Sequence, residues 1–264
     1  MTVDCHTHIF ESGHGGPFDL PASAGDLVRE MDVHHVDLSI VLPLPGVATN
    51  EFVHQQCALF PERLVGLYTP EFERPAETLT KMETFFQHYH PCGLKIHPRW
   101  QRVTVNDSVV REALAWAGEH NLPVLFDLFP HGEELDNPLL HPLAYHRLAQ
   151  EMPNLRMILA HSGGYKVIET FLVAKSNPNV FLDISFTPLY FRGSSVASDL
   201  AFVCQRIPLG RILYGSDFPN IRFGDSLQAA YNLTADLNDA AKATLFGGAA
   251  LELFRLARSY QQRS

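Results

Sequence analysis

The chain has 264 residues, of which 46% are hydrophobic and 19% charged, and its formal net charge at pH 7 is −9. This acidic balance argues against a nucleic-acid or anionic-membrane partner, and no apolar run approaches the roughly 18 residues that a membrane span requires. The four cysteines are scattered and no signal peptide precedes Val3, so we expect a protein of the reduced cytoplasm.

Eight short apolar runs predict the strands of a parallel sheet, because each is followed by a longer amphipathic stretch at the spacing of a βαβ unit. The predicted strands are 2–9, 37–44, 63–70, 92–98, 123–129, 156–163, 180–186 and 211–219. The predicted helices are about 24–34, 49–60, 75–88, 107–120, 141–151, 165–176, 195–206 and 226–236, with a helical tail at 239–258.

Near-continuous apolar strands that alternate with helices indicate a sheet covered on both sides. Eight strand–helix pairs favour a closed barrel over an open doubly wound sheet. The first strand is followed by HTHIFESGHGG, which lacks the GxGxxG turn of a dinucleotide-binding fold. The sequence therefore predicts an α/β protein, a (β/α)8 TIM barrel in a single domain over residues 1–264. Two stacked α/β halves are the less favoured alternative.

Ionisable side chains lie near the carboxyl ends of five of the predicted strands, where the active site of a barrel of this kind is built. They are His6, His8, Lys95, His97, Asp127, His161 and Asp217. Side chains alternate along a strand, so His6 and His8 share one face, as do Lys95 and His97. Burying these groups together is costly without a cation, and imidazole with carboxylate suits zinc, manganese or iron(II). The sequence therefore predicts a metal site.

Four motifs carry a resemblance to a known family: DCHTHIF, GLKIHPRWQ, LAHSGG and YGSDFP, in this order between residues 4 and 219. Together they resemble the amidohydrolase superfamily, in the branch that includes aminocarboxymuconate semialdehyde decarboxylase, resorcylate decarboxylases and 2-pyrone-4,6-dicarboxylate lactonase. The resemblance implies a distorted (β/α)8 barrel with His6 and His8 as metal ligands. It also implies that His161 is a ligand or catalytic histidine, and that Asp217 is a ligand and proton shuttle.

One position departs from the family pattern. A typical member has a metal-binding histidine late in strand five, in a stretch like LPVLFHTG, where this chain has LPVLFDLF. Asp127 therefore occupies a ligand position and can supply oxygen to the metal, directly or through a water. The departure also permits a metal-free site, because pyrone lactonases of this branch lack the histidine and work without a metal.

The expected cofactor is a divalent metal ion, with zinc favoured and manganese or iron open. One ion per chain is favoured. Two become possible if Lys95 is carboxylated and bridges them, as a strand-four lysine does in binuclear relatives; otherwise Lys95 stays an ammonium that binds a substrate anion or forms a structural ion pair.

Four residues are expected to bind substrate: Lys95, His97, Arg99 and Arg192. Arginine grips carboxylates and planar groups, and loops at this face carry specificity, so the expected partner is a small, anionic molecule. His131 is expected to be exposed. Superfamily relatives often form homo-oligomers, which leaves that state open for this chain.

Three functions fit these residues. The first is a metal-dependent hydrolase of a C–N or C–O bond, in an amide, a cyclic amide or a lactone, in which Asp217 moves the proton of the attacking water and His161 stabilises the oxyanion or binds the metal. The second keeps the site but decarboxylates an aromatic or unsaturated carboxylic acid. The third is a metal-free lactonase or a non-catalytic barrel subunit.

Overall fold

The structure is a computed structural model that describes residues 1–130 and 137–256, so His131 lies outside the described residues. Its parallel strands are β1 (Val3–Thr7), β4 (Leu38–Val41), β5 (Leu64–Gly66), β6 (Leu94–Ile96), β7 (Val124–Phe126), β8 (Met157–Leu159), β9 (Val180–Asp183) and β10 (Ile212–Leu213). Each of them lies within one of the predicted runs. A small antiparallel hairpin, β2 (His14–Gly15) with β3 (Leu20–Pro21), follows β1.

The strands form a ring. They pair in the orders β1-β4-β5 and β10-β9-β8-β7-β6, and backbone hydrogen bonds join these two groups on both sides. Between β5 and β6, Lys95 N donates to Tyr68 O at 2.8 Å, and between β1 and the end of β10, Cys5 N donates to Tyr214 O at 2.9 Å. The predicted TIM barrel is therefore confirmed.

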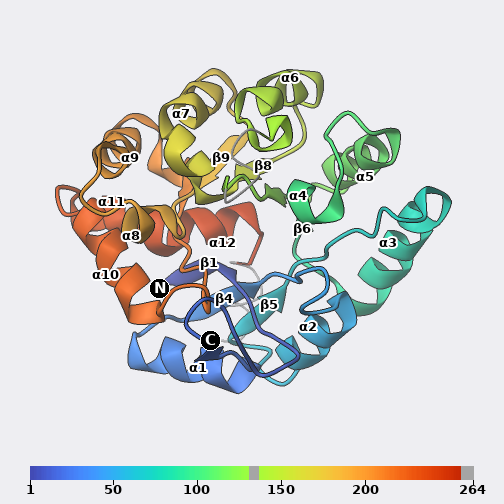
Figure 1. The fold of residues 1–264 in the computed structure, drawn as a ribbon, viewed down its shortest axis with the longest axis horizontal. Helices are drawn as coiled ribbons and strands as arrows, with labels where there is room; N and C mark the ends of the chain where they lie inside the picture. Colours follow the sequence, from blue (N-terminus) through green and yellow to red (C-terminus); the bar gives the residue numbers. More distant parts are fainter. Residues whose placement is uncertain (131–136, 257–264) are drawn as a thin grey trace.

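Most of the helices form an outer layer around this ring (Figure 1). The longer ones are α1 (Ala24–Val33), α2 (Asn50–Cys57), α3 (Pro75–Tyr89), α5 (Ser108–Glu119), α6 (Leu143–Glu151), α7 (Val167–Ser176), α9 (Ser195–Arg206) and α10 (Phe223–Leu233). Shorter ones are α4 (Pro98–Gln101), α8 (Thr187–Tyr190), α11 (Asp239–Ala243) and α12 (Ala249–Leu253). None of the helices in the described ranges has the length and apolar character needed to cross a membrane.

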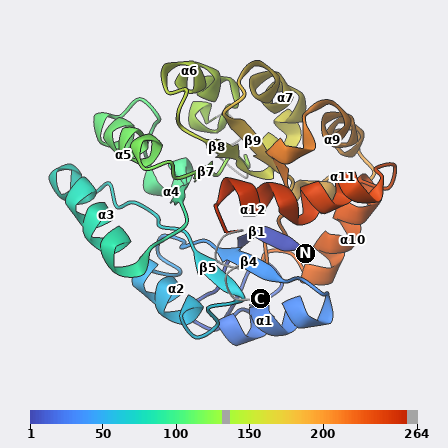
Figure 2. The same ribbon diagram turned by 180° about the vertical axis from the view of Figure 1, so that it is seen from behind.

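The interior of the barrel is apolar at one end. Helix α12 lies across that end in the view from behind (Figure 2), where Ala250 and Leu253 belong to one buried cluster with Val3 and Leu38, which are early residues of their strands. This packing closes the barrel at the amino ends of the strands. The polar residues lie at the opposite end of the barrel, at the carboxyl ends of the strands.

The predicted strands and long helices are confirmed, with ends that differ by up to six residues, and residues 257–258 of the predicted helical tail lie outside the described residues. The sequence did not predict α4, α8 or the β2–β3 hairpin. Each of these elements has four residues or fewer per segment, which is too short to show a helical or an alternating pattern.

Candidate functional site

Strand alternation turns two charged side chains into the barrel. On β6, Leu94 and Ile96 pack outward in the core beneath the helices, which leaves Lys95 pointing inward. On β7, Leu125 lies in the inner cluster, so Asp127, two residues later, points the same way. Both side chains line a pocket of about 400 Å³ at the carboxyl ends of the strands.

All seven residues predicted at the strand ends line this pocket: His6, His8, Lys95, His97, Asp127, His161 and Asp217. Arg99 lines it as well. Arg192 is exposed and lies outside it. The structure thus brings together eight of the nine residues that the sequence singled out, from segments far apart in the chain.

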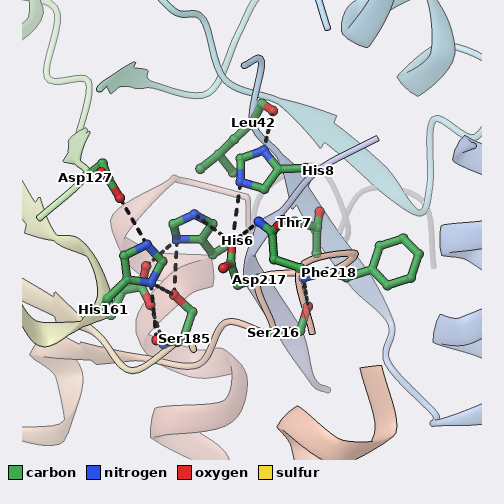
Figure 3. A network of polar contacts seen from close by, with 12 residues as sticks. His6, Thr7, His8, Leu42, Asp127, His161, Ser185, Ser216, Asp217 and Phe218 are labelled. Atoms are coloured by element: carbon green, nitrogen blue, oxygen red, sulfur yellow. Dashed lines mark hydrogen bonds and ion pairs between the residues drawn. The ribbon is translucent and has the colours of Figure 1, made fainter. Parts of the chain in front are cut away.

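His6 and His8 have their Nδ1 atoms occupied and their Nε2 atoms turned toward Asp217 (Figure 3). Nδ1 of His6 contacts Asp183 Oδ2 at 2.6 Å, and Nδ1 of His8 contacts Leu42 O at 3.0 Å. Both partners are acceptors, so each ring carries its proton on Nδ1 and presents the Nε2 lone pair to the pocket. Histidines that bind metal ions in proteins are commonly held this way.

Asp217 lies between these two rings. Its Oδ1 is 3.5 Å from Nε2 of His8 and 3.6 Å from Nε2 of His6. Its backbone N donates to His6 O at 2.8 Å, and its φ of 63° is a left-handed conformation that aspartate tolerates better than bulkier residues. Burial alone would raise the pKa of Asp217, but the neighbouring histidines outweigh that effect and lower it, so the carboxylate is ionised.

The donor atoms are close enough to share one cation. One atom each from His6, His161 and Asp217 lies within 4.8 Å of the other two, and the three residues are buried. Burial lowers the pKa of His6 to about 4, with Lys95 adding to this shift and Asp183 opposing it. A neutral imidazole is the form that coordinates a metal, so this environment fits a divalent cation.

His161 is positioned by an unusual backbone turn. Directly after β8, His161, Ser162, Gly163 and Gly164 all have positive φ values, between 47° and 75°. The turn directs the His161 ring toward Ser185, whose Oγ lies 2.9 Å from His161 Nδ1. Such strained stretches persist where the surrounding structure fixes them, and they concentrate at functional sites.

Asp127 joins two histidines. Its Oδ1 is 3.2 Å from His161 Nε2, and its Oδ2 is 3.2 Å from His97 Nε2. Burial opposes the charge on Asp127, but His97 and His161 outweigh that effect and hold its pKa well below the usual range. Burial disfavours a charged His161 too, yet Asp127 and the other carboxylates raise its pKa. Asp127 therefore contacts His161 and His97, and it stands outside the group of His6, His161 and Asp217.

The walls of the pocket are residues that the sequence did not single out. They are mainly apolar or aromatic and include Phe10, Leu44, Phe129 and Phe186. Phe129 and Phe186 each follow a strand by a few residues, which is a signal that could have identified them. Phe10 and Leu44 come from loops whose path the hydrophobic pattern does not reveal.

Asp183 provides a first test of the site, since it is fully buried and holds His6 through Nδ1. We expect Asp183→Asn to weaken the binding of a divalent cation by about 10- to 100-fold, because the His6 ring loses the carboxylate that fixes its proton and orientation. Calorimetric titration of the metal-free protein with zinc measures the effect. Asp236→Asn, at an exposed position, is the control. Equal affinity in Asp183→Asn and wild type would contradict the assigned role of Asp183.

Comparisons with known proteins agree with this geometry. The amidohydrolase family model matches residues 3–256 of the chain. The chain belongs to the amidohydrolase family. It is accordingly an enzyme of the amidohydrolase type, as the sequence motifs predicted. No curated protein has a significant sequence match to it.

Solved structures of this fold share the same barrel at low sequence identity. A probable 2-pyrone-4,6-dicarboxylic acid hydrolase from Acinetobacter baumannii, with citric acid bound, superposes with a TM-score of 0.71 at 14% identity, covering 96% of this chain and 98% of that one. A 5-carboxyvanillate decarboxylase from Sphingomonas paucimobilis gives 0.72 at 14% identity, with the same coverage. An amidohydrolase from Burkholderia multivorans with bound zinc gives 0.74 at 13% identity, covering 97% and 99%. At these identities the likeness establishes the fold.

Proposed function

We propose that this chain is a metal-dependent hydrolase that opens a C–N or C–O bond, in an amide, a cyclic amide or a lactone, of a small anionic substrate. The observation that carries the proposal is the place of Asp217 in the pocket, within 3.6 Å of the Nε2 atoms of both His6 and His8. An ionised carboxylate at this point can take a proton from a water held beside the substrate carbonyl. Two of the relatives are named as hydrolases, which supports this assignment.

The residues present fit a divalent cation. We assign His6, His8 and Asp217 as its ligands, because both histidines offer Nε2 and the carboxylate lies between them. His161 is also within 4.8 Å of His6 and Asp217, but its two ring nitrogens face Asp127 and Ser185, so we leave it outside the ligand set. Zinc is favoured by this donor set and by the zinc in one relative, with manganese or iron as alternatives. When bound, the ion would polarise the carbonyl and lower the pKa of a water molecule.

Asp217 carries out both proton transfers of the reaction. Asp217 accepts a proton from the attacking water as its oxygen bonds to the carbonyl carbon. The same carboxyl group gives that proton to the leaving nitrogen or oxygen when the C–N or C–O bond breaks. His161 is held between Asp127 and Ser185, and its Nε2–H, which faces Asp127 Oδ1 at 3.2 Å, is shared with the oxygen that becomes negative. Asp127 in this account orients His161.

Replacing Asp127 tests the role just given to it. We expect Asp127→Ala to keep its metal and to lose about 10- to 100-fold of kcat, since His161 loses the carboxylate that orients it. Metal content and steady-state kinetics on the same preparation measure both effects. If Asp127→Ala loses the metal, Asp127 is a ligand, which is the role that its sequence position predicted.

Decarboxylation is the second candidate, because the same pocket has aromatic walls and the 5-carboxyvanillate relative is named a decarboxylase. A panel of aromatic acids, lactones and cyclic amides separates the two reactions. We expect opening of the lactone or cyclic amide ring, measured by the release of acid, and no formation of bicarbonate. Bicarbonate release from the aromatic acids, without hydrolysis of any lactone or amide, would overturn it in favour of the lyase.

A further inference from the structure

Phe186, shortly after β9, has a backbone conformation that bulky residues rarely adopt. Its φ is 63° and its ψ is −52°, and Thr187 N donates to Ser185 O across it at 2.6 Å. These values define a γ-turn with a positive φ at its centre, which is the rare and strained form of this turn. Glycine adopts such a φ without strain, whereas a phenylalanine at this point costs stability.

The surrounding structure holds this turn in place. Ser185 N donates to Asp183 Oδ1 at 2.5 Å, and Thr187 Oγ1 donates to His161 O at 2.5 Å. Ser185 Oγ also lies 2.9 Å from His161 Nδ1. Ser185 and Thr187 are fully buried. The backbone is therefore fixed on both sides of Phe186 by contacts with residues of the site.

The turn places the Phe186 ring at the wall of the pocket, next to His161. The ring lines the pocket together with Phe129 and His161. Its centroid is 4.7 Å from that of Phe129, edge to face, and 6.0 Å from that of the His161 ring. Tyr190 stacks on Phe186, with centroids 5.1 Å apart and an angle of 24° between the planes. These contacts leave the ring little freedom to turn away from the pocket.

A strained residue points to a function of its side chain, because glycine would fit this turn without strain. In the proposed reaction His161 shares a hydrogen bond with the carbonyl oxygen, so the carbonyl lies beside the Phe186 ring. A group attached to the carbonyl carbon on this side meets the ring. Since the ring is fixed, a bulky group there can be accommodated only by distorting the wall of the pocket.

We propose that Phe186 determines substrate specificity by limiting the size of the group attached to the carbonyl carbon. A small aliphatic group, such as the ring methylene of a lactone or cyclic amide, fits beside the ring, and an aryl group is disfavoured. The inference rests on the proposed function for the position of the carbonyl, beside the cation and His161.

Calorimetry with acetohydroxamate and benzohydroxamate on the zinc-loaded protein tests this role, because the two probes differ only in the group on the carbonyl carbon. We expect wild type to bind acetohydroxamate at least about tenfold more tightly than benzohydroxamate. We expect Phe186→Ala and Phe186→Gly to shift this ratio toward benzohydroxamate by about 10- to 100-fold. Phe191→Ala is the matched control, since Phe191 follows the same short helix α8 and lies outside the pocket.

Thermal unfolding of the two variants tests the backbone conformation of Phe186. Glycine adopts a positive φ more readily than alanine, so we expect Phe186→Gly to unfold at a temperature about 2 to 4 °C above that of Phe186→Ala. If Phe186→Ala does not fold, Phe186→Gly carries the binding test alone.

Four results would overturn the role of Phe186: equal binding of the two probes by wild type, an unchanged ratio in the folded variants, an equal change in Phe191→Ala, or a Phe186→Ala protein at least as stable as Phe186→Gly. If zinc-loaded wild type bound neither hydroxamate, both this role and the metal site of the proposed function would be contradicted. The binding assay involves no turnover. Size selection in a protein that hydrolyses no lactone or amide would contradict the proposed function and leave the role of Phe186 standing.

Discussion

An Asp217→Asn variant is expected to keep its fold and to lose about a thousandfold of kcat/KM. The amide has the shape of the carboxylate but cannot accept the proton of the attacking water, and it is a weaker partner for a cation beside His6 and His8. Kinetics on a substrate that wild type opens measure the loss, and circular dichroism checks the fold.

Asp225→Asn is the matched control for this variant, because Asp225 is an exposed carboxylate on α10, only eight residues further along the chain. We expect it to act as wild type does. If Asp217→Asn reduced kcat/KM by less than about tenfold, Asp217 would not be the group that transfers the protons, and the proposed hydrolysis would have no general base.

Removal of the metal with a chelator is expected to reduce hydrolysis to background and to be reversed by zinc. Without the ion, His6, His8 and Asp217 face one another with no charge to polarise a carbonyl, and a loss of several kcal/mol of transition-state stabilisation corresponds to about a thousandfold or more in rate. The measurement is kcat/KM before chelation, after it, and after stoichiometric zinc is returned.

The control for chelation is a protein carried through the same dialysis without chelator. Full activity after verified removal of the metal would contradict the cation's role. It would also favour the metal-free lactonase that the aspartate at position 127 permits.

The sequence predicted the barrel and the positions of the polar residues because both follow from local pattern. Period-two alternation and a strand end are enough to place Lys95 inside the barrel and Asp127 at its mouth. The sequence did not predict the contacts among these residues. That Asp127 would face both His97 and His161 depends on the register of β6, β7 and β8 and on the left-handed turn after β8.

Arg99 and Arg192 show the same limit for substrate binding. Both follow predicted strands, and nothing in the composition of their loops distinguishes them. Arg99 lies on the short helix α4, which brings it to the pocket, whereas Arg192 follows α8 and is exposed. Elements of four residues decide which arginine reaches the pocket, and they carry too little periodicity to be predicted.

The central claim is that His6, His8 and Asp217 hold a divalent cation, and elemental analysis tests it most directly. Wild type, His8→Ala and Asp225→Asn are purified without chelator and their metal content per chain is measured. We expect near-stoichiometric metal in wild type and Asp225→Asn, and little in His8→Ala. Absence of metal from folded wild type after zinc is supplied, or equal metal in His8→Ala, would contradict it.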